Sequence, residues 1–508
     1  MKTPYYIYSD WSRYFCFCII LVLTGCQHHP SVPTEFADTD SLPHIYPDYT
    51  DVTIPANIAP LNFMAADKGT DACVAHFTWP GGEAVYGQDN KIIIPAGEWR
   101  DMLAAARGGS VSIVLYTHCE DAGKWTRHRP FRFHVSEDEI DPYVSYRLIS
   151  PSYVGYEMLG IYQRDLTSFD ERTIYNNMLV SGERDGQCIN CHSYQNYGTR
   201  NMQFHMRQSL GGTMIVKDGV PKKVNLKTDR TISAGVYPAW HPTLPLVAYS
   251  TNLTGQSFHT KDVAKIEVQD SESDLILYDV EANTVSTISA VGNELEVYPA
   301  WNPDGDTLYY ASAHFVFNDS LEKDFDAINR YQEMKYDIYC RPFDRTTKRF
   351  GEPDTVFSAS AVGQSATLPR ISPCGRYLLF AMGGWGCFHI WHPDADLYLT
   401  DLYTGETRPL EQVNSPQAES YHSWSSNGRW IVLSSRRDDG NYTRLYLAYF
   451  DRQGHAHKAF ALPQHSPEFY HQFLRSYNVP EFMVEPVRIS PQEFAAAARR
   501  EPVQAKDE

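Results

Sequence analysis

The feature that most constrains the fold is an internal repeat in the second half of the chain. In each copy an apolar run enters a turn rich in Pro, Asn, Asp and Gly, and a second apolar run leaves it; the copies lie at residues 236–250, 297–312, 367–381 and 420–434. Pro presets φ in such turns and Gly or Asn accepts a positive φ, so each copy predicts two strands joined by a tight turn. A later alternating run follows in every copy, at residues 274–279, 336–340, 395–401 and 444–449. Four strands per copy, repeated along the chain, predict a β-propeller.

One position just before the turn is matched in all copies, and it is occupied by Trp240, Trp301, Ile371 and Trp424. This position, the turn chemistry and the strand spacing together resemble the repeat of TolB-type propellers, which reads x-P-x-W-S-P-D-G followed by an apolar run. The resemblance covers about residues 232–465 and implies a TolB-like propeller with six blades. A two-sheet β-sandwich is the alternative fold, but it does not explain four aligned turns.

Two further blades are expected upstream of the four clear copies. One candidate spans residues 143–162 and the other residues 202–226. In the second, Phe204 aligns with Trp240, which places His205 opposite His241. We therefore expect the propeller to occupy residues 141–475, with residues 182–200 as an insertion.

The composition fits a folded, mainly β protein. Of 508 residues, 43% are hydrophobic and 34 are Tyr, a β-prone aromatic, alongside 31 Gly and 31 Pro. This apolar content is ample to offset the entropy of ordering the chain. The formal charge of −18 repels phosphate backbones, so we expect no nucleic acid as a partner.

Two smaller parts flank the expected propeller. Residues 49–140 predict a small β-rich, sandwich-like domain with one helical stretch at residues 98–106; its strand-like runs lie at residues 91–94, 111–116 and 131–135. Residues 476–508 predict a C-terminal tail with one short helix. Ser490 and Glu493 have capping-box spacing, and Pro491 falls at the first helical position.

The N-terminus predicts an export signal with a lipid anchor. Lys2 and Arg13 precede a short apolar run that suits a signal peptide over residues 1–25. The run ends in L-T-G-C, which resembles the lipobox of bacterial lipoproteins, so Cys26 would carry the lipid. An ordinary signal peptide followed by an incidental cysteine is the alternative. Residues 26–48, rich in Pro, Ser, Thr and Asp, predict a flexible tether.

The location of the protein follows from this signal. No other stretch approaches about 18 apolar residues, so the lipid is the only expected membrane anchor. Gln27, rather than Asp, follows Cys26, which in the familiar sorting pattern favours the outer membrane. We expect a cell-envelope lipoprotein on the periplasmic side of the outer membrane.

The sharpest chemical motif is C-x-x-C-H, formed by Cys188, Cys191 and His192. Two thiols at this spacing can form thioethers to the vinyl groups of one haem, and the adjacent histidine can bind its iron. Export strengthens this prediction, because covalent haem is attached outside the bacterial cytoplasm. A structural zinc site, a thioredoxin-like redox pair and a plain Cys188–Cys191 disulfide remain as alternatives.

The second axial ligand of this haem would come from Met202 or His205, the nearest candidates along the chain. On an extended strand Met202, Phe204 and Met206 share one face, whereas His205 points to the other. The competing interpretation is that Met202 and Met206 are core residues and that His205 lines the propeller channel. The sequence leaves this choice open.

The remaining cysteines fit an oxidising compartment without deciding their pairing. Cys73 and Cys119 either form a disulfide or stay as two buried thiols. Among Cys340, Cys374 and Cys387 at most one pair can form.

Other residues of the repeat region also leave alternatives open. The histidines either build a metal or substrate site at the channel mouth or are scattered over the surface; they are His241, His259, His314, His389, His392 and His422. Tyr237, Tyr298 and Tyr421 recur just before the turn and either line the channel or stack between blades. The chain has no G-x-S-x-G elbow and no P-loop, so a hydrolase of the prolyl-peptidase type is disfavoured.

Several segments together look like a family of exported TolB-like propeller proteins with a haem-binding motif, common in Bacteroidales. They are residues 141–149, 160–164, 186–194 and 202–207. The resemblance implies fold and compartment but no known reaction. We expect an electron carrier with one haem c and a redox or envelope protein partner. A protein- or glycan-binding module without haem chemistry and a haem peroxidase-like enzyme are the alternatives.

Overall fold

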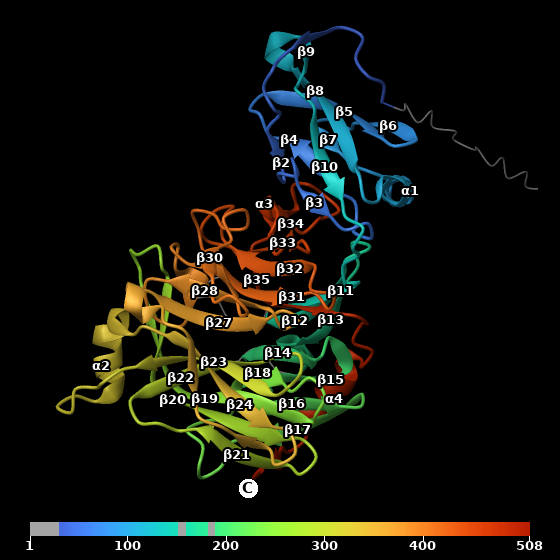
Figure 1. Ribbon diagram of the computed structural model, residues 1–508. Helices are drawn as coiled ribbons and strands as arrows, with labels where there is room; N and C mark the ends of the chain where they lie inside the picture. Colours follow the sequence, from blue (N-terminus) through green and yellow to red (C-terminus); the bar gives the residue numbers. More distant parts are fainter. Residues whose placement is uncertain (1–29, 151–158, 181–187) are drawn as a thin grey trace, which may run out of the picture.

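The computed structural model describes residues 30–150, 159–180 and 188–508. Over these residues the chain is mainly β, and its strands form many sheets in two groups (Figure 1). One group lies near the N-terminus, and the larger group follows it along the chain. The expected signal peptide and Cys26 lie outside the described residues.

The N-terminal group contains a seven-stranded sheet and a three-stranded sheet. The larger sheet runs in the order β1 (Phe36–Asp38), β9 (Lys124–Arg127), β8 (Ser110–Cys119), β10 (Phe131–Val135) and β3 (Thr53–Ile54), with β5 (Thr70–Trp79) paired to β8 and β6 (Gly82–Tyr86) paired to β5. The smaller sheet contains β2 (Ile45–Tyr46), β4 (Phe63–Ala65) and β7 (Lys91–Ile92). The strands expected at residues 91–94, 111–116 and 131–135 are present.

Helix α1 (Ala96–Ala106) confirms the helical stretch expected in this region. Its buried side chains Trp99, Met102, Leu103 and Ala106 recur at three- and four-residue spacing, so one face of the helix packs on the sheets. The indole of Trp99 donates to the Ile58 carbonyl oxygen at 2.8 Å.

Part of the segment expected as a tether belongs to the N-terminal sheets. Residues 36–38 pair in parallel with β9, and residues 45–46 pair with β4. Arg127 also forms an ion pair with Asp38 at 2.6 Å. Backbone pairing satisfies the amides that a free tether would expose to water, which explains why this stretch is ordered.

The second group consists of four-stranded antiparallel sheets. In the order inner to outer strand they are β35 (Ser476–Met483), β11 (Tyr143–Ile149), β12 (Gly160–Asp165), β13 (Glu171–Asn176); β14 (Ile189–Gln195), β15 (Gly198–Met206), β16 (Gly212–Lys217), β17 (Val220–Asn225); β18 (Val236–Trp240), β19 (Leu246–Phe258), β20 (Ile266–Asp279), β21 (Thr284–Ser289); β22 (Glu294–Trp301), β23 (Thr307–His314), β24 (Asp337–Asp344), β26 (Asp354–Phe357); β27 (Ser365–Ile371), β28 (Tyr377–Gly383), β29 (Asp396–Asp401), β30 (Thr407–Pro409); and β31 (Glu419–Trp424), β32 (Trp430–Ser435), β33 (Arg444–Tyr449), β34 (Phe460–Ala461). One bridge between Ser273 and Leu295 joins the third and fourth sheets. The short β25 (Arg349–Phe350) also pairs with β24.

The inner strands of these sheets are neighbours around an axis. β14, β18, β22, β27, β31 and β35 contact one another in this order, and β35 in turn contacts β14. This is a propeller-like arrangement, as the repeat predicts. The strands expected in all four clear copies are present.

A strand from the C-terminal region, β35, closes this ring. β35 pairs antiparallel with β11, so the sheet of β11, β12 and β13 takes its inner strand from the C-terminal region. Residues 476–483 are therefore part of the sheets, whereas the sequence predicts a tail. β14 is likewise an inner strand, although the sequence predicts an insertion at residues 182–200.

The C-terminal helix forms as the capping pattern predicts. α4 (Pro491–Ala498) begins after Ser490, whose hydroxyl accepts from the Glu493 amide at 3.3 Å. The Glu493 carboxylate accepts in return from the Ser490 amide at 2.8 Å. Phe494 on the buried face packs against Phe204 of β15. Two short strands follow, β36 (Val503–Gln504) and β37 (Lys506–Asp507), which pair with β17 and β21.

The matched tryptophans of the repeat tie neighbouring sheets together. The Trp301 indole donates to the Ala239 carbonyl oxygen, and the Trp424 indole donates to the Arg370 carbonyl oxygen, both at 3.1 Å. Each bond joins an inner strand to the inner strand before it. The repeat therefore sets the spacing between sheets as well as the turn within each sheet.

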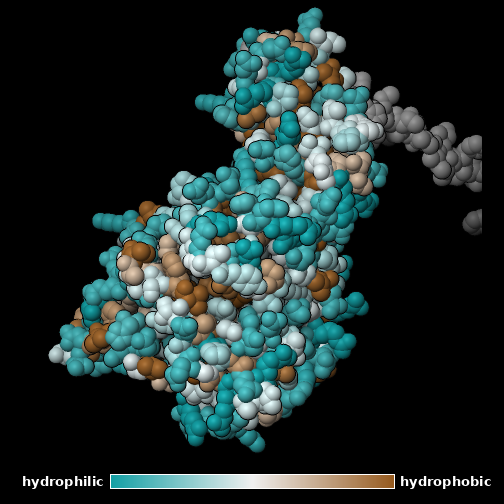
Figure 2. Space-filling view, in the orientation of Figure 1, coloured by the Kyte–Doolittle hydropathy of each residue, from teal (hydrophilic) through white to brown (hydrophobic). Residues whose placement is uncertain are grey.

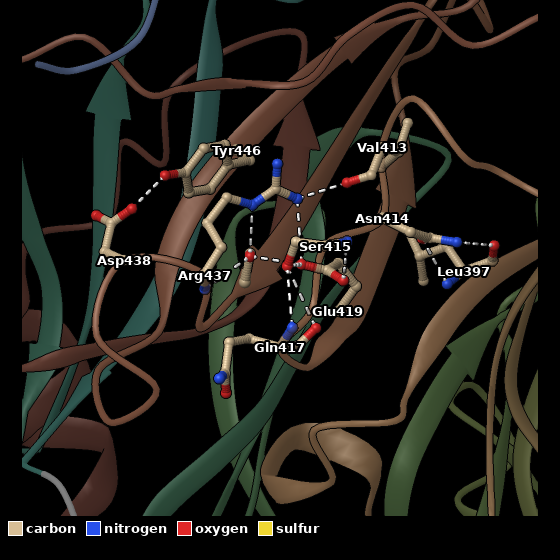
Figure 3. Close-up of polar contacts among 10 residues, drawn as sticks. Leu397, Val413, Asn414, Ser415, Gln417, Glu419, Arg437, Asp438 and Tyr446 are labelled. Carbon is tan, nitrogen blue, oxygen red and sulfur yellow. Dashed lines mark hydrogen bonds and ion pairs between the residues drawn. The ribbon is translucent and has the colours of Figure 1, made fainter. Parts of the chain in front are cut away.

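A buried ion pair fixes the start of inner strand β31 (Figure 3). Glu419 is fully buried and accepts from Ser415 at 2.6 Å, Ser435 at 2.7 Å and Arg437 at 3.1 Å. The guanidinium of Arg437 stacks on Tyr446, 4.2 Å from the ring centre. These bonds hold the loop before β31 against β32 and β33.

The surface is mostly hydrophilic, with some apolar side chains over helix α2 (Lys323–Arg330), which projects from one side of the ring (Figure 2). None of the described helices is long and apolar enough to span a bilayer.

Ring closure by β35 gives a first testable prediction. A chain truncated after residue 475 loses β35 and α4 and leaves β11 with an unpaired edge. We expect this truncation to abolish cooperative thermal unfolding, measured by circular dichroism, because the sheets are no longer held in a ring.

The matched control is truncation after residue 501, which removes only β36 and β37 at the outer edges. Its melting temperature should stay within about 5 °C of that of the full chain. Cooperative unfolding of the shorter chain at a similar temperature would contradict the role assigned to β35.

Candidate functional site

The inner strands share one unusual backbone position. A residue other than glycine has positive φ at the same place in each strand: Cys191 (57°), Tyr237 (49°), Tyr298 (55°), Leu368 (58°), Tyr421 (42°) and Val479 (52°). The pairing register of each inner strand shifts beside this residue. The recurrence marks a β-bulge that turns one side chain of every inner strand toward the axis.

These residues surround a central cavity with an empty volume of about 490 Å³, called here the inner cavity. Its wall includes the whole ring of positive-φ residues together with Asn190, His192 and Arg370. Tyr237 and Tyr298 approach each other with ring centres 4.3 Å apart. The tyrosines that recur in the repeat therefore line the channel, and this pair also joins neighbouring sheets.

Two residues of the C-x-x-C-H motif, Cys191 and His192, lie on this wall. Cys191 is buried on inner strand β14, and burial raises the pKa of its thiol, opposed by Arg207 and Arg147 among other groups. Cys188 is half-buried one residue before the strand and packs against an apolar cluster. Both thiols are free, so the structure contains no Cys188–Cys191 disulfide.

His192 is one of the most buried polar residues near the axis, with 1% of its surface exposed. Neither ring nitrogen has a hydrogen-bond partner of normal geometry. Burial lowers the pKa of His192 to about 3, and Arg147 lowers it further, while backbone groups of Ser145 and Val479 oppose the shift. The imidazole is therefore neutral at physiological pH and offers a free lone pair.

The two candidates for a second axial ligand lie on opposite faces of the same sheet. Met202 pairs in register with Tyr194, which shares the face of His192, and Met202 is fully buried in an apolar cluster. His205 pairs with Asn190 on the other face and contacts the Thr213 hydroxyl at 3.3 Å. Burial lowers the pKa of His205 to about 3. The strand backbone separates His205 from His192, as strand alternation predicts.

The structure gives a different alignment for this sheet from the one expected. Because β14 rather than β15 is the inner strand, the counterpart of Trp240 is Tyr194, not Phe204. One signal in the sequence could have found this counterpart. The three-residue spacing from Tyr237 to Trp240 recurs from Cys191 to Tyr194.

At one end the inner cavity meets a wider part of the channel, called here the funnel, which has an empty volume of about 1010 Å³. Its wall contains the matched aromatic or aliphatic residue of every inner strand: Tyr194, Trp240, Trp301, Ile371, Trp424 and Phe482. Arg370 lines both the funnel and the inner cavity, so the two spaces meet there. It forms an ion pair with Glu481 of β35 at 2.7 Å. Sequence reasoning missed both charged residues, because no motif marks them.

Most histidines of the repeat region are buried and bonded, which corrects the interpretation that they are scattered over the surface. His241 contacts the Gly305 carbonyl oxygen at 2.8 Å, and His422 contacts the Leu379 carbonyl oxygen at 3.2 Å. His389 and His392 are also buried. His314 is exposed and pairs with Glu294 at 2.7 Å.

The end of the channel opposite the funnel is covered by a loop between β28 and β29. His392 of this loop forms an ion pair with Glu267 of β20 at 2.9 Å, and both side chains are almost fully buried. The Trp385 indole donates to the same carboxylate at 3.0 Å. Cys387, in the same loop, lies close enough to Tyr237 and Tyr298 to help raise their pKa values.

The structure gives no support to a zinc site or to a disulfide at the cysteines. Within residues 30–150, 159–180 and 188–508, no group of three or more His, Cys, Asp or Glu side chains is placed to hold a metal ion. All cysteines in this part of the chain are free, including Cys73 and Cys119. The disulfides considered for Cys73 with Cys119, and among Cys340, Cys374 and Cys387, do not form in the structure.

Comparison with known proteins finds only distant likenesses. No family model matches the chain, and no curated protein matches it. A chain of the nidogen/laminin complex is similar with a TM-score of 0.36 and 7% identity, covering 63% of this chain and 99% of that one. A puromycin-hydrolyzing peptidase of Mycobacterium tuberculosis is similar with a TM-score of 0.31 and 13% identity, over 61% of this chain and 45% of that one. An apocarotenoid oxygenase of Synechocystis is similar with a TM-score of 0.37 and 10% identity, over 85% and 95%. This chain thus spans less than half of the peptidase, and no activity follows from these likenesses.

A buried carboxyl beside the axis gives a second prediction. Glu296 lies two residues before Tyr298 on β22, and burial raises its pKa from 4.5 to about 7, opposed by Ser289 and Arg341. The folded state holds a proton that the unfolded state releases above pH 4.5. The resulting stabilisation is full below pH 4.5 and is lost as pH rises through 7, and a shift of this size corresponds to about 3 kcal/mol.

Glu296→Gln removes this proton linkage. We expect the free energy of unfolding of the wild type, measured in urea, to fall by about 3 kcal/mol relative to Glu296→Gln between pH 4.5 and 8. The exposed Glu322→Gln variant is the control and should follow the wild type. Parallel pH profiles for the wild type and Glu296→Gln would show that Glu296 is not the titrating group.

Proposed function

We propose that the chain is a lipid-anchored, haem-binding protein built on a six-bladed TolB-like propeller, and that it transfers electrons to or from a redox or envelope protein. The ring of inner strands and the repeat support the blade number. The proposed location is the periplasmic side of the outer membrane, reached through the signal peptide and lipidation of Cys26. The haem is a single haem c attached to Cys188 and Cys191.

The observation that carries the haem proposal is the state of His192. It follows directly after two free thiols, and both of its ring nitrogens are buried without a hydrogen-bond partner of normal geometry, although backbone groups of Ser145 and Val479 lie close to the ring. Leaving a buried polar group unpaired costs about 1–3 kcal/mol, so such groups are rare without a functional reason. An axial bond to iron would satisfy one of these nitrogens. The donor types, two thiols and an imidazole, are those of a c-type haem, which would supply one-electron redox chemistry. In the structure, however, Cys191 faces the inner cavity and Cys188 packs against an apolar cluster.

The neighbouring residues support this role for the chain. Cys191 faces the inner cavity, which tyrosines and prolines line. Arg147 is buried behind His192, with its Nε unpartnered, and lowers the pKa values of both His192 and Cys191. A buried cation at this place favours the more negative state of a nearby group. It favours an ionised carboxylate over the neutral acid, and a reduced redox centre over the oxidised one.

The position of the second ligand favours one competing function. His205 lies on the face of the sheet away from His192, and Met202 is packed among apolar side chains. An iron held by His192 would then have an open position, which is the requirement for a haem peroxidase-like enzyme. His205 and Met202 therefore remain proposals as ligands, and an open site is the second candidate.

The funnel favours a third function. Its aromatic wall and the Arg370–Glu481 pair form a recognition surface that needs no haem. A protein- or glycan-binding module with a purely structural Cys188 and Cys191 would use this surface. Absence of covalent haem in the experiment below would favour it.

The haem proposal is tested by removing both thiols. Cys188→Ala with Cys191→Ala should abolish haem staining after denaturing electrophoresis, because no thioether can form. The protein is coexpressed with cytochrome c maturation factors, and circular dichroism checks that the variant remains folded.

Cys374→Ala is the matched control, since Cys374 is an exposed thiol in the same ring of sheets. Its haem staining should equal that of the wild type. A wild type without covalent haem under these conditions would refute the haem proposal.

The membrane anchor is tested separately. Cys26→Ala should move the protein from the membrane fraction to the soluble fraction, because the lipid on this residue is the proposed attachment. Cys18→Ala, within the apolar run of the signal peptide, should leave the protein in the membrane fraction. Immunoblots of both fractions measure the distribution, and a membrane-bound Cys26→Ala variant would argue for a different anchor.

A further inference from the structure

The narrow point of the channel lies where the funnel meets the inner cavity, and we call it the throat. It is formed by the residue directly before the matched position of each inner strand. On one side these are Arg370, Ser423 and Glu481, which all line the funnel. The throat therefore has a polar side formed by these three residues.

The charges of the throat cancel. The guanidinium of Arg370 reaches over strand β31 to the Glu481 carboxylate at 2.7 Å, so the two charges neutralise each other. An ion entering this space would leave its hydration shell among Trp, Tyr, Pro and Leu side chains. Burying an unpaired ion is far more costly than burying an uncharged polar group.

Uncharged hydrogen-bonding groups do have unused partners along the channel. Ser423 Oγ and Trp240 Nε1 in the funnel, and Tyr298 OH in the inner cavity, are buried and have no hydrogen-bond partner. Each of these side chains is more than nine-tenths buried. They offer both donors and acceptors, in order from the funnel to the ring that contains Cys191.

The opposite end of the channel gives no comparable route. The loop that carries Trp385, Cys387 and His392 covers it, and the buried Glu267–His392 pair ties this loop to β20. Strands alternate in direction, so this loop and the tight turns around the funnel lie at opposite ends of the ring.

We propose that the funnel and throat form an inlet through which small, uncharged, hydrogen-bonding solutes reach Cys191, and that the Arg370–Glu481 pair excludes ions of the same size. The solutes are of the class of water, hydrogen peroxide and small amides. The proposal rests on the geometry of the channel and holds whether or not a haem is attached.

The test uses two alkylating reagents of nearly equal size, the neutral iodoacetamide and the anion iodoacetate. The full chain is produced without maturation factors, so that Cys191 stays a free thiol. Peptide mass spectrometry follows the rate of modification at Cys191 and at the exposed Cys374 in the same molecule. Both reagents react with the thiolate, so the ratio of their modification rates at one thiol does not depend on its thiolate fraction. The same ratio at Cys374 corrects for the intrinsic reactivities of the two reagents.

In the wild type we expect iodoacetamide to be favoured over iodoacetate at Cys191 by about tenfold or more, relative to the ratio at Cys374. Arg370→Met with Glu481→Gln removes both charges at similar side-chain size and should lower this preference at least fivefold; an unchanged or higher preference would contradict the role given to the pair. Ser423→Phe fills the throat and should slow both reagents at Cys191 about tenfold, while Cys374 reacts at the wild-type rate.

Glu267→Gln loosens the opposite end and is the control, with wild-type rates expected at Cys191. Thermal unfolding checks that each variant is folded; if Ser423→Phe does not fold, Ile371→Trp narrows the funnel instead. Three outcomes would overturn the inlet. The first is an equal reagent ratio at Cys191 and Cys374, and the second is no modification of Cys191. The third is faster modification of Cys191 in Glu267→Gln without slower modification in the variant with the filled throat. A missing haem in the separate staining experiment would leave this result unaffected.

Discussion

The structure depends most on the antiparallel pairing of β11 with β35, which joins the two ends of the ring. Val479, Glu481 and Phe482 all belong to β35, and they contribute to the inner cavity, the throat and the funnel respectively. Without this pairing the first sheet has no inner strand, and each level of the channel loses one wall. Its backbone hydrogen bonds therefore support the fold and the candidate site together.

The positive-φ residue of each inner strand explains how the motif is displayed. A left-handed conformation in a non-glycine residue costs about 1–2 kcal/mol, and here the neighbouring inner strands hold it in place. At Cys191 this conformation directs the thiol to the inner cavity, while His192 lies toward β11 and β35. A short C-x-x-C-H segment thus presents its sulfur and its imidazole in different directions around one strand.

The electrostatics near the axis differ from those of the whole chain. The formal charge is −18, yet Arg147, Arg207 and Arg370 lower the pKa values of thiols or imidazoles around the motif. Glu481 neutralises Arg370, whereas Arg147 forms no ion pair with any carboxylate in the described part of the chain. The side of β14 that Arg147 approaches is consequently more positive than the acidic surface of the chain.

The repeat alone determined the four clear sheets, their turns and the aromatic position that ties neighbouring inner strands together, because turn chemistry and strand alternation are local properties of the chain. The capping box at Ser490 was predictable for the same reason. Only the tertiary structure decided that β14 and β35 are inner strands, since their partners lie far away in the sequence and their repeat signals are weak. It also brought Arg370 and Glu481 together from separate strands and separated His205 from His192, because ring closure and sheet faces depend on pairing that no short motif encodes.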